Sequence, residues 1–386
     1  MLPHQGESLT QLVREEVLKL QPYKPGKPSE EVKRELGVED VLKLASNENP
    51  IGPSPKALEA IQAALKEVHI YPDGGCHSLK HALASHLKIG EENLILGNGS
   101  DEIIKIIAET FLNQGEEVIC GDPTFSQYAW AARIMGARCV AVPMKNFHYD
   151  LEAISLKIRP RTKLIFLGNP NNPTGTMITR QEVDNLLKNI PPHVIVVFDE
   201  AYSEYVTSPD FPDTLAYVRS GAQVITLRTF SKIYGLAGLR IGYAVAPPEM
   251  VDYMNRARNP FNANSLAQAA ALASLADHEH VKKSQKLVAE GIKYLYREFK
   301  RMGLSWVPTQ ANFVLLHVGV DSHELFRKML QEGVIVRPCG IFGLRDYIRV
   351  TVGTWAQNSR MVRTLENCLA SFSRGDKLHM EQAAAK

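Results

Sequence analysis

The stretch VIVVFDEAY, residues 194–202, decides the fold of this chain. Its first five residues are all apolar and mostly β-branched, which is typical of a strand covered on both faces. Strands of this kind belong to parallel sheets that lie between layers of helices. Asp199 follows the strand directly, and ligands of such sheets bind beyond the carboxyl ends of the strands. The stretch therefore predicts an α/β fold with a polar site near Asp199.

Apolar runs of the same kind recur along the chain, with helical patterns between most of them. These runs cover residues 94–96, 117–120, 138–142, 163–167, 224–227 and 241–245. They predict a large domain with a mostly parallel sheet between helix layers. After Pro247 and Pro248, a long helical region over residues 266–302 precedes further short strands and helices. This change of pattern predicts a second, smaller α/β domain.

The predicted units are arranged discontinuously along the chain. A helix is expected over about residues 8–20, and the proline-rich stretch after it predicts an extended arm. The tail lacks apolar periodicity and is predicted to be disordered. The expected units are an N-terminal arm, residues 1–27; a large domain, residues 46–256; a small domain, residues 28–45 with 257–372; and the tail, residues 373–386.

Composition excludes several classes of protein. The 386 residues carry 44 Lys and Arg against 42 Asp and Glu, a formal net charge of +2, so nucleic acid is not an expected partner. The five cysteines form no C-x-x-C pair, which favours a reducing, cytoplasmic setting over a disulfide framework or a zinc ribbon. No signal-peptide core and no run of membrane-spanning length occurs. We expect a cytoplasmic protein with neither a membrane nor a metal partner.

A second polar cluster follows the run at residues 224–227. Thr229, Ser231 and Lys232 come first, and Arg240 follows eight positions after Lys232. Hydroxyls and a guanidinium suit a dianionic phosphate, and a neighbouring cation depresses the pKa of an amine, so Lys232 can act as a nucleophile. Taken alone, such a lysine is usually a solvated surface residue. Asp199 alone would fit a helix cap or a structural ion pair equally well.

Two loops complete the polar set. The turn GNGSD, residues 97–101, offers backbone N–H groups and a helix N-terminus to an anion. Position 102 is Glu, so the dinucleotide fingerprint G-x-G-x-x-G fails, and no P-loop motif occurs either. The loop GNPNNPTG, residues 168–175, is rigid and rich in side-chain amides that can point into a site.

Together these segments resemble the aspartate-aminotransferase-like enzymes of fold type I, which use pyridoxal 5'-phosphate (PLP), and within them the histidinol-phosphate aminotransferase group. The matching stretches stand in family order: LASNENP (44–50), YPD (71–73), NNPTG (171–175), DEAY (199–202), TFSK (229–232), GLR (238–240), PFN-x-NS (260–265) and IRVTVG (348–353). The resemblance implies a transaminase that exchanges an amino group between L-histidinol phosphate and 2-oxoglutarate in histidine biosynthesis.

The resemblance also implies a role for each matching residue. Lys232 would hold PLP covalently and shuttle the proton during transamination, while Asp199 would keep the pyridine nitrogen protonated. Asn172 and Tyr202 match positions that hydrogen-bond the phenolic oxygen of the ring, and Phe125 matches an aromatic residue that stacks on it. Core packing is the alternative role for Phe125.

Further positions match contacts of the phosphate and the substrate. The cofactor phosphate would contact Ser100, Asp101, Thr229, Ser231 and Arg240, and Tyr71 would reach it from a neighbouring subunit. The resemblance thus implies a homodimer with shared active sites. The substrate would contact Arg349, which binds its anionic end, together with Tyr23, Asn262 and Arg337.

Three alternative functions remain open from the sequence. An aromatic amino acid aminotransferase would use the same motifs, because the pocket of this group accepts planar rings. A PLP lyase resembling threonine-phosphate decarboxylase has closely similar motifs. A non-catalytic regulator built on a retired aminotransferase domain is the third, but the residues before the first motif hold no helix-turn-helix pattern.

Overall fold

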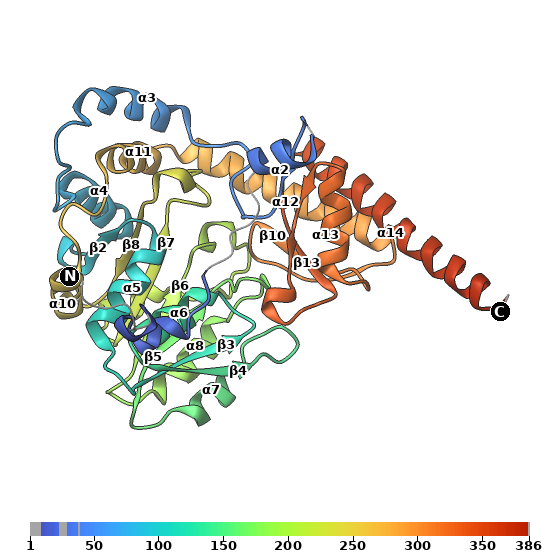
Figure 1. Cartoon of the computed structure of the whole chain (residues 1–386). Helices are drawn as coiled ribbons and strands as arrows, with labels where there is room; N and C mark the ends of the chain where they lie inside the picture. The colour runs from blue at the N-terminus through green and yellow to red at the C-terminus, as the bar shows by residue number, and fades with distance from the viewer. Residues whose placement is uncertain (1–8, 23–28, 38, 385–386) are drawn as a thin grey trace, which may run out of the picture.

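The fold is built around a seven-stranded sheet. A computed structural model describes residues 9–22, 29–37 and 39–384 (Figure 1). In the sheet, only β8 runs antiparallel to its neighbours. The strands, in spatial order, are β2 Leu94–Gly97, β8 Gly242–Val245, β7 Val224–Thr229, β6 Ile195–Asp199, β5 Thr162–Gly168, β3 Glu117–Asp122 and β4 Arg138–Pro143. The predicted α/β fold with a mostly parallel sheet is confirmed.

Helices cover both faces of this sheet, which explains its apolar strands. Successive strand residues point to opposite faces, so Phe166 packs against one helix layer and its neighbour Leu167 against the other. One layer contains α5 Ser100–Phe111, α6 Ser126–Ile134 and α10 Pro248–Ala257. The other contains α4 His77–Leu87, α7 Leu151–Lys157, α8 Arg180–Lys188, α9 Thr214–Arg219 and α11 Ser265–Leu275, with α3 Pro55–Ala64 packed on α11.

A second unit, at the right of Figure 1, is built on a four-stranded antiparallel sheet. Its strands, in spatial order, are β12 Arg337–Pro338, β13 Tyr347–Thr351, β10 Phe313–His317 and β9 Ser305–Val307. Its helices are α2 Ser29–Leu36, α12 His278–Arg301, α13 Ser322–Gln331 and α14 Trp355–Ala384, and a parallel pair, β1 Leu42–Lys43 with β11 Val334–Ile335, lies beside it. The domain boundaries given above remain a prediction.

Short 3-10 helices connect several of these elements. They are η2 Leu65–Glu67, η3 Glu91–Asn93, η4 Ser203–Tyr205, η5 Ala237–Leu239 and η6 Gly340–Phe342. The helix α12 touches both units, because the side-chain amide of Gln285 donates to the carbonyl oxygen of Glu204 at 2.6 Å. Within the described part of the chain, no helix combines the length and the apolar character that crossing a bilayer requires.

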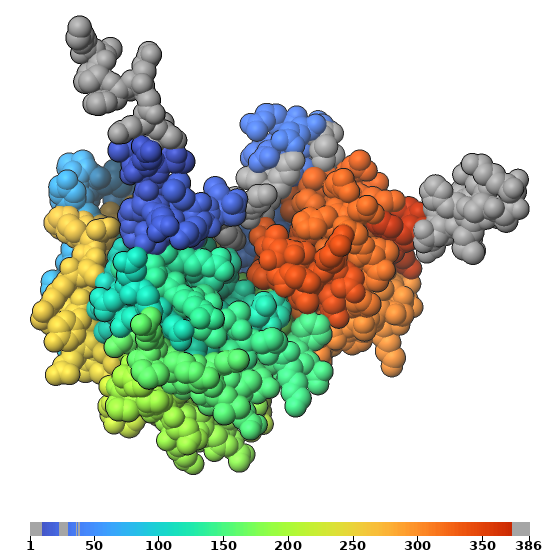
Figure 2. Space-filling view, turned by 60° about the horizontal axis from the view of Figure 1, so that its bottom comes forward, coloured from blue at the N-terminus to red at the C-terminus, as the bar shows by residue number. Residues whose placement is uncertain are grey.

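The N-terminal helix is shorter than the sequence predicts. The expected helix over residues 8–20 is replaced by η1 Leu9–Leu12 and a short α1 Glu15–Leu18. Leu12, Val17 and Leu18 remain exposed here, and short helices are stable only through the packing of an apolar face. The segment is anchored where Arg14 Nη2 donates to the carbonyl oxygen of Ile134 at 2.8 Å, and Figure 2 shows it lying against that surface.

The C-terminal segment also differs from the prediction. Residues 373–384, for which the sequence predicts disorder, continue α14 as a helix to Ala384. Their sequence holds no proline and several strong helix formers, among them Leu378, Ala383 and Ala384. Helix propensity therefore prevails where apolar periodicity gives no signal.

Candidate active site

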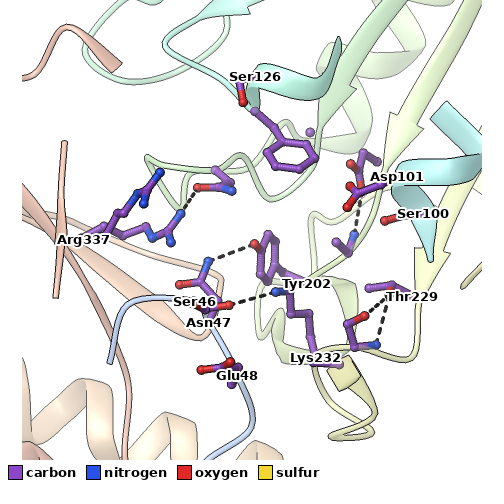
Figure 3. Close-up of a pocket in the computed structure, with 18 of the residues that line it drawn as sticks. Ser46, Asn47, Glu48, Ser100, Asp101, Ser126, Tyr202, Thr229, Lys232 and Arg337 are labelled. Atoms are coloured by element: carbon purple, nitrogen blue, oxygen red, sulfur yellow. Dashed lines mark hydrogen bonds between the residues drawn. The ribbon is translucent and has the colours of Figure 1, made fainter. Parts of the chain in front are cut away.

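One pocket lies beyond the carboxyl ends of the parallel strands, where the large sheet faces the four-stranded sheet (Figure 3). Strand β6 delivers Asp199 to it, β7 delivers Thr229, and the paired strands β12 and β13 deliver Arg337 and Arg349. The predicted site residues that line the pocket are Ser100, Asp101, Phe125, Asn172, Asp199, Tyr202, Thr229, Ser231, Lys232, Arg240, Arg337 and Arg349.

Asp199 is a buried carboxylate with few hydrogen-bond donors around it. It is 5% exposed, the hydroxyl of Tyr128 donates to its Oδ2 at 2.8 Å, and the backbone N–H of Ala201 donates to its Oδ1 at 3.2 Å. Burial raises the pKa of Asp199 to about 6, against the opposing effect of the hydrogen bond from Tyr128. At neutral pH the group is mostly an ionised carboxylate, and a cationic partner would stabilise its buried charge.

Lys232 is a half-buried amine in this pocket. Its Nζ donates to the carbonyl oxygen of Ser46 at 3.1 Å, a hydrogen bond that is marked in Figure 3, and lies 5.8 Å from the centre of the Tyr202 ring. Burial, followed by the charge of Arg349, lowers the pKa of Lys232 to about 8. A substantial fraction of the amine is therefore uncharged, and nucleophilic, at mildly alkaline pH.

The N-terminus of α5 and the residues after β7 form a cradle for an anion. The hydroxyl of Thr229 donates to Ser231 Oγ at 3.0 Å, and Arg240 Nη1 lies 3.5 Å from the same oxygen. Arg240 Nη2 pairs with Asp101 at 3.4 Å. Gly99 has a φ of 82°, and a Cβ there would lie 2.5 Å from Arg240 Nη2. Glycine is thus needed for the guanidinium to approach the turn.

Arg349 and Asn47 hold the side chains of Asn172 and Tyr202 by hydrogen bonds. Asn172 Oδ1 accepts a hydrogen bond from Arg349 Nη1, and Tyr202 Oη accepts one from Asn47 Nδ2 at 3.0 Å. Arg349 is 6% exposed and also donates to the carbonyl oxygen of Ala45 at 2.7 Å. It lies directly opposite Arg337 across the β12–β13 pair, so the pocket has two cationic forks on one wall.

The segment 44–49 joins both units at the pocket. The backbone N–H of Thr351 donates to the carbonyl oxygen of Leu44 at 2.9 Å, and that of Asn47 donates to Thr351 Oγ1 at 2.9 Å. On the other side, Asn49 Nδ2 donates to the carbonyl oxygen of Ile233 at 2.8 Å. The residue after Lys232 and the sheet that carries Arg349 are therefore held by one short stretch of chain.

Two predicted site residues, Tyr71 and Asn262, do not line the pocket, and a third lies outside the described residues. Tyr71 is 80% exposed and stacks on Phe261, with ring centres 4.9 Å apart. Asn262 lies behind the cradle, where its Nδ2 donates to Glu102 at 2.7 Å and to the carbonyl oxygen of Leu96 at 3.2 Å. Tyr23 lies outside the described residues.

Other residues line the pocket without an expected role. Ser46, Asn47 and Glu48 belong to the matching stretch LASNENP, for which the resemblance implies no contact. Tyr128 carries no motif signal, and its only sequence clue is that it stands three positions after Phe125 at the start of a helix. Among the described residues, no three His, Cys, Asp or Glu side chains gather as metal ligands.

The donor set fits PLP. A carboxylate, an amine of lowered pKa and a cradle of hydroxyls and a guanidinium line a single pocket, and no side chain of Gly99 blocks the cradle. These are the groups that a pyridine nitrogen, an aldehyde and a phosphate require. The fold and the site together define a transaminase of fold type I. The chain belongs to the class I and II aminotransferases, because the sequence model of that family matches residues 39–365.

Within this family the chain is similar to histidinol-phosphate aminotransferases, as its motifs predict. The relative of that name from Moorella thermoacetica is 56% identical over 358 residues, which cover 92% of this chain and 93% of the relative. The one from Caldicellulosiruptor saccharolyticus is 44% identical, with 93% of this chain and all of the relative covered (100%).

Solved structures lead to the same group. Histidinol-phosphate aminotransferase from Sinorhizobium meliloti, in complex with pyridoxal-5'-phosphate, matches with a TM-score of 0.87 at 28% identity, covering 93% of this chain and 98% of the other. An aspartate aminotransferase double mutant from Thermus thermophilus matches with a TM-score of 0.79 at 24% identity, covering 94% and 99%. The second match shows the common fold.

Proposed function

We propose that this protein is a PLP-dependent transaminase that takes the amino group of L-histidinol phosphate and passes it to 2-oxoglutarate, in histidine biosynthesis. The observation that carries the proposal is that Lys232, Asp199 and the Arg240 cradle line one pocket in a chain that is 56% identical to a histidinol-phosphate aminotransferase. When bound, PLP supplies an electron sink that stabilises negative charge on the substrate carbon.

Each residue around the cofactor would have a separate role. Asp199, ionised at neutral pH, would hold a proton on the pyridine nitrogen, which strengthens the electron sink. The Lys232 amine would bond to the cofactor aldehyde and, once displaced by the substrate amine, would carry the proton from the substrate carbon to the cofactor. Asn172 and Tyr202 would hydrogen-bond the phenolic oxygen of the ring.

The two arginines would hold the substrate by its anionic end. Arg349 is fixed by Ala45 and Asn172, and Arg337 lies beside it on the next strand. A guanidinium fork binds either a phosphate or a carboxylate. The same wall would therefore accept the phosphate ester of histidinol phosphate in one half-reaction and a carboxylate of the oxo acid in the other.

A homodimer would complete the site. Tyr71 is exposed on a stretch that also exposes Leu65, Val68 and Ile70, and this stretch leaves apolar surface uncovered in the single chain. We place a second copy of the chain against this surface, so that Tyr71 of one subunit reaches the phosphate cradle of the other. The cytoplasmic location that the sequence predicts remains a prediction.

Steady-state assays of the purified enzyme test the proposed activity. We expect histidinol phosphate with 2-oxoglutarate to give the highest kcat/KM. Equal or higher efficiency with phenylalanine would instead favour an aromatic amino acid aminotransferase, and release of CO2 from threonine phosphate would favour a lyase. Either result would overturn the assignment of the substrate.

The substitution Lys232→Ala tests the chemistry. We expect it to abolish turnover. We also expect that borohydride no longer fixes the cofactor covalently to the protein, because no other amine lines the pocket within the described residues. Lys293→Ala, at an exposed position of α12, is the matched control and should retain activity. Undiminished activity of Lys232→Ala would refute the proposed mechanism.

A further inference from the structure

Tyr128 is the side chain that contacts the Asp199 carboxylate most closely. It lies on α6, is 1% exposed and donates its hydroxyl hydrogen to Asp199 Oδ2 at 2.8 Å. The other oxygen, Oδ1, receives only the weaker contact from the Ala201 N–H at 3.2 Å. The Tyr128 hydroxyl is therefore the principal hydrogen-bond donor that this chain provides to Asp199.

The packing around Tyr128 fixes the direction of that hydroxyl. Its ring stacks on Phe166, with centres 4.9 Å apart and planes 7° apart, and meets Phe125 edge-on at 5.7 Å. At Gly168, the last residue of β5, a Cβ would lie 3.3 Å from the Tyr128 hydroxyl oxygen and 3.3 Å from Asn171 Oδ1, so glycine leaves room for both side chains. Aromatic contacts of this kind hold a ring in one orientation.

Burial and the neighbouring charges keep the Tyr128 hydroxyl protonated beside Asp199. Burial, and then the negative charge of Asp199, raises the pKa of Tyr128 far above its ordinary value, so the hydroxyl stays protonated. The titratable groups that face the pair are Asp101 from α5, Lys232 after β7, Tyr202 after β6 and Tyr149 before α7. Asp101 opposes the ionisation of Asp199, whereas the Tyr128 hydrogen bond and Lys232 favour it.

We propose that Tyr128 is a positioning residue for the transamination: it orients the Asp199 carboxylate and keeps it ionised, so that the proton between Asp199 and the cofactor stays on the pyridine nitrogen. This inference rests on the proposed function. Without the hydroxyl, Asp199 would compete more strongly for that proton, and the electron sink would weaken.

The substitution Tyr128→Phe removes only the hydroxyl and tests the inference on the PLP-loaded enzyme. We expect kcat to fall about tenfold with little change in KM, the amount that a lost hydrogen bond to a charged group supports. When Asp199 draws the proton away from the pyridine nitrogen, the cofactor ring carries less positive charge, and the Lys232 nitrogen bound to the cofactor holds its own proton more tightly. The pH midpoint of the near-visible absorbance band should therefore rise by about one unit.

Two further variants separate positioning from general packing. Tyr205→Phe also deletes a buried tyrosine hydroxyl, but Tyr205 does not line the pocket, so its absorbance midpoint should match the wild type. In an Asp199→Asn background, Tyr128→Phe should change PLP affinity much less than in the wild type, because no ionisable carboxylate remains. Gly168→Ala, which crowds the hydroxyl, should raise the midpoint in the same direction, and it provides the test if Tyr128→Phe does not fold.

The outcomes are distinguishable. An unchanged absorbance midpoint in Tyr128→Phe, or an equal loss of PLP affinity with and without Asp199, would overturn the positioning role while leaving the transaminase intact. Failure of the wild-type protein to bind PLP at all would overturn the proposed function instead.

Discussion

Asp199 is buried and Lys232 is half-buried in the same pocket, with opposite effects on their pKa values. Burial disfavours the charged form of each, so the pKa of Asp199 rises to about 6 and that of Lys232 falls to about 8. Both values are close to neutral pH, where a small change of environment moves a proton. Such perturbed pairs are typical of catalytic sites and less typical of structural ion pairs.

The substitution Asp199→Asn should stabilise the cofactor-free protein. Because the unfolded chain loses this proton first, the stability of the wild type falls as pH rises from about 4 to about 6 and stays lower above that range. A pKa rise from 3.8 to about 6 corresponds to at most about 3 kcal/mol. Asn does not titrate, so the variant avoids this loss.

Urea unfolding of the cofactor-free protein measures this effect. The stability difference between Asp199→Asn and the wild type should grow from about pH 4 to about pH 6 and stay level above that range. Asp252→Asn, at an exposed position of α10, should show no such growth. A difference that stays constant with pH would contradict the buried charge as its source.

Single residues show what the sequence can and cannot predict about the site. Asp199 could be found because it directly follows an apolar run, and Lys232 because it stands in the polar cluster after another, since the ends of parallel strands converge. Tyr128 could not, because its hydroxyl reaches Asp199 only through the packing of α6 on the sheet. Asn262 matches a family position, yet the single chain places it behind the cradle, bonded to Glu102.

At the scale of elements, local signals and long-range packing contribute separately. The apolar run at residues 163–167 predicts β5 Thr162–Gly168 within a residue at each end, because a buried strand needs apolar side chains on both faces. The reversed direction of β8 carries no such signal, since it depends on which neighbours the strand pairs with. The expected N-terminal helix is shorter because its contact with α6 leaves Leu12, Val17 and Leu18 exposed in the single chain.

Helix α8 does not line the pocket, so its contribution to stability can be tested separately from activity. Thr179 and Glu182 form a reciprocal capping box, in which each side chain accepts a hydrogen bond from the backbone N–H of the other residue. Thr179→Ala should lower the free energy of unfolding by about 1 kcal/mol and leave kcat unchanged, because neither residue lines the pocket.

Chemical denaturation beside steady-state assays checks this prediction. Thr179→Ser keeps a side-chain acceptor and should retain most of the stability. A fall in kcat for Thr179→Ala would show that α8 influences the pocket after all.

At the scale of the whole molecule, the proposed homodimer makes a prediction about mixtures. If Tyr71 serves the partner's cradle, a hybrid of one Tyr71→Ala subunit and one Lys232→Ala subunit contains one complete site and one doubly defective site. Random mixing should then restore activity to about a quarter of the wild-type level.

Co-refolding of the two inactive variants provides the measurement, with sedimentation to establish the dimer. Mixing Lys232→Ala with wild type is the control and should only dilute activity. No recovery in the mixture of Tyr71→Ala and Lys232→Ala, with dimers present, would place Tyr71 outside the neighbouring site.

The segment 44–49 links the movement of the two units to the absorbance expected of the cofactor-loaded enzyme. It is bonded to Thr351 in one unit and to Ile233, the residue after Lys232, in the other. A movement of one unit against the other would strain or break one of these hydrogen bonds. If Lys232 holds PLP as proposed, such a movement would also disturb the cofactor, and the absorbance of the loaded enzyme would report it.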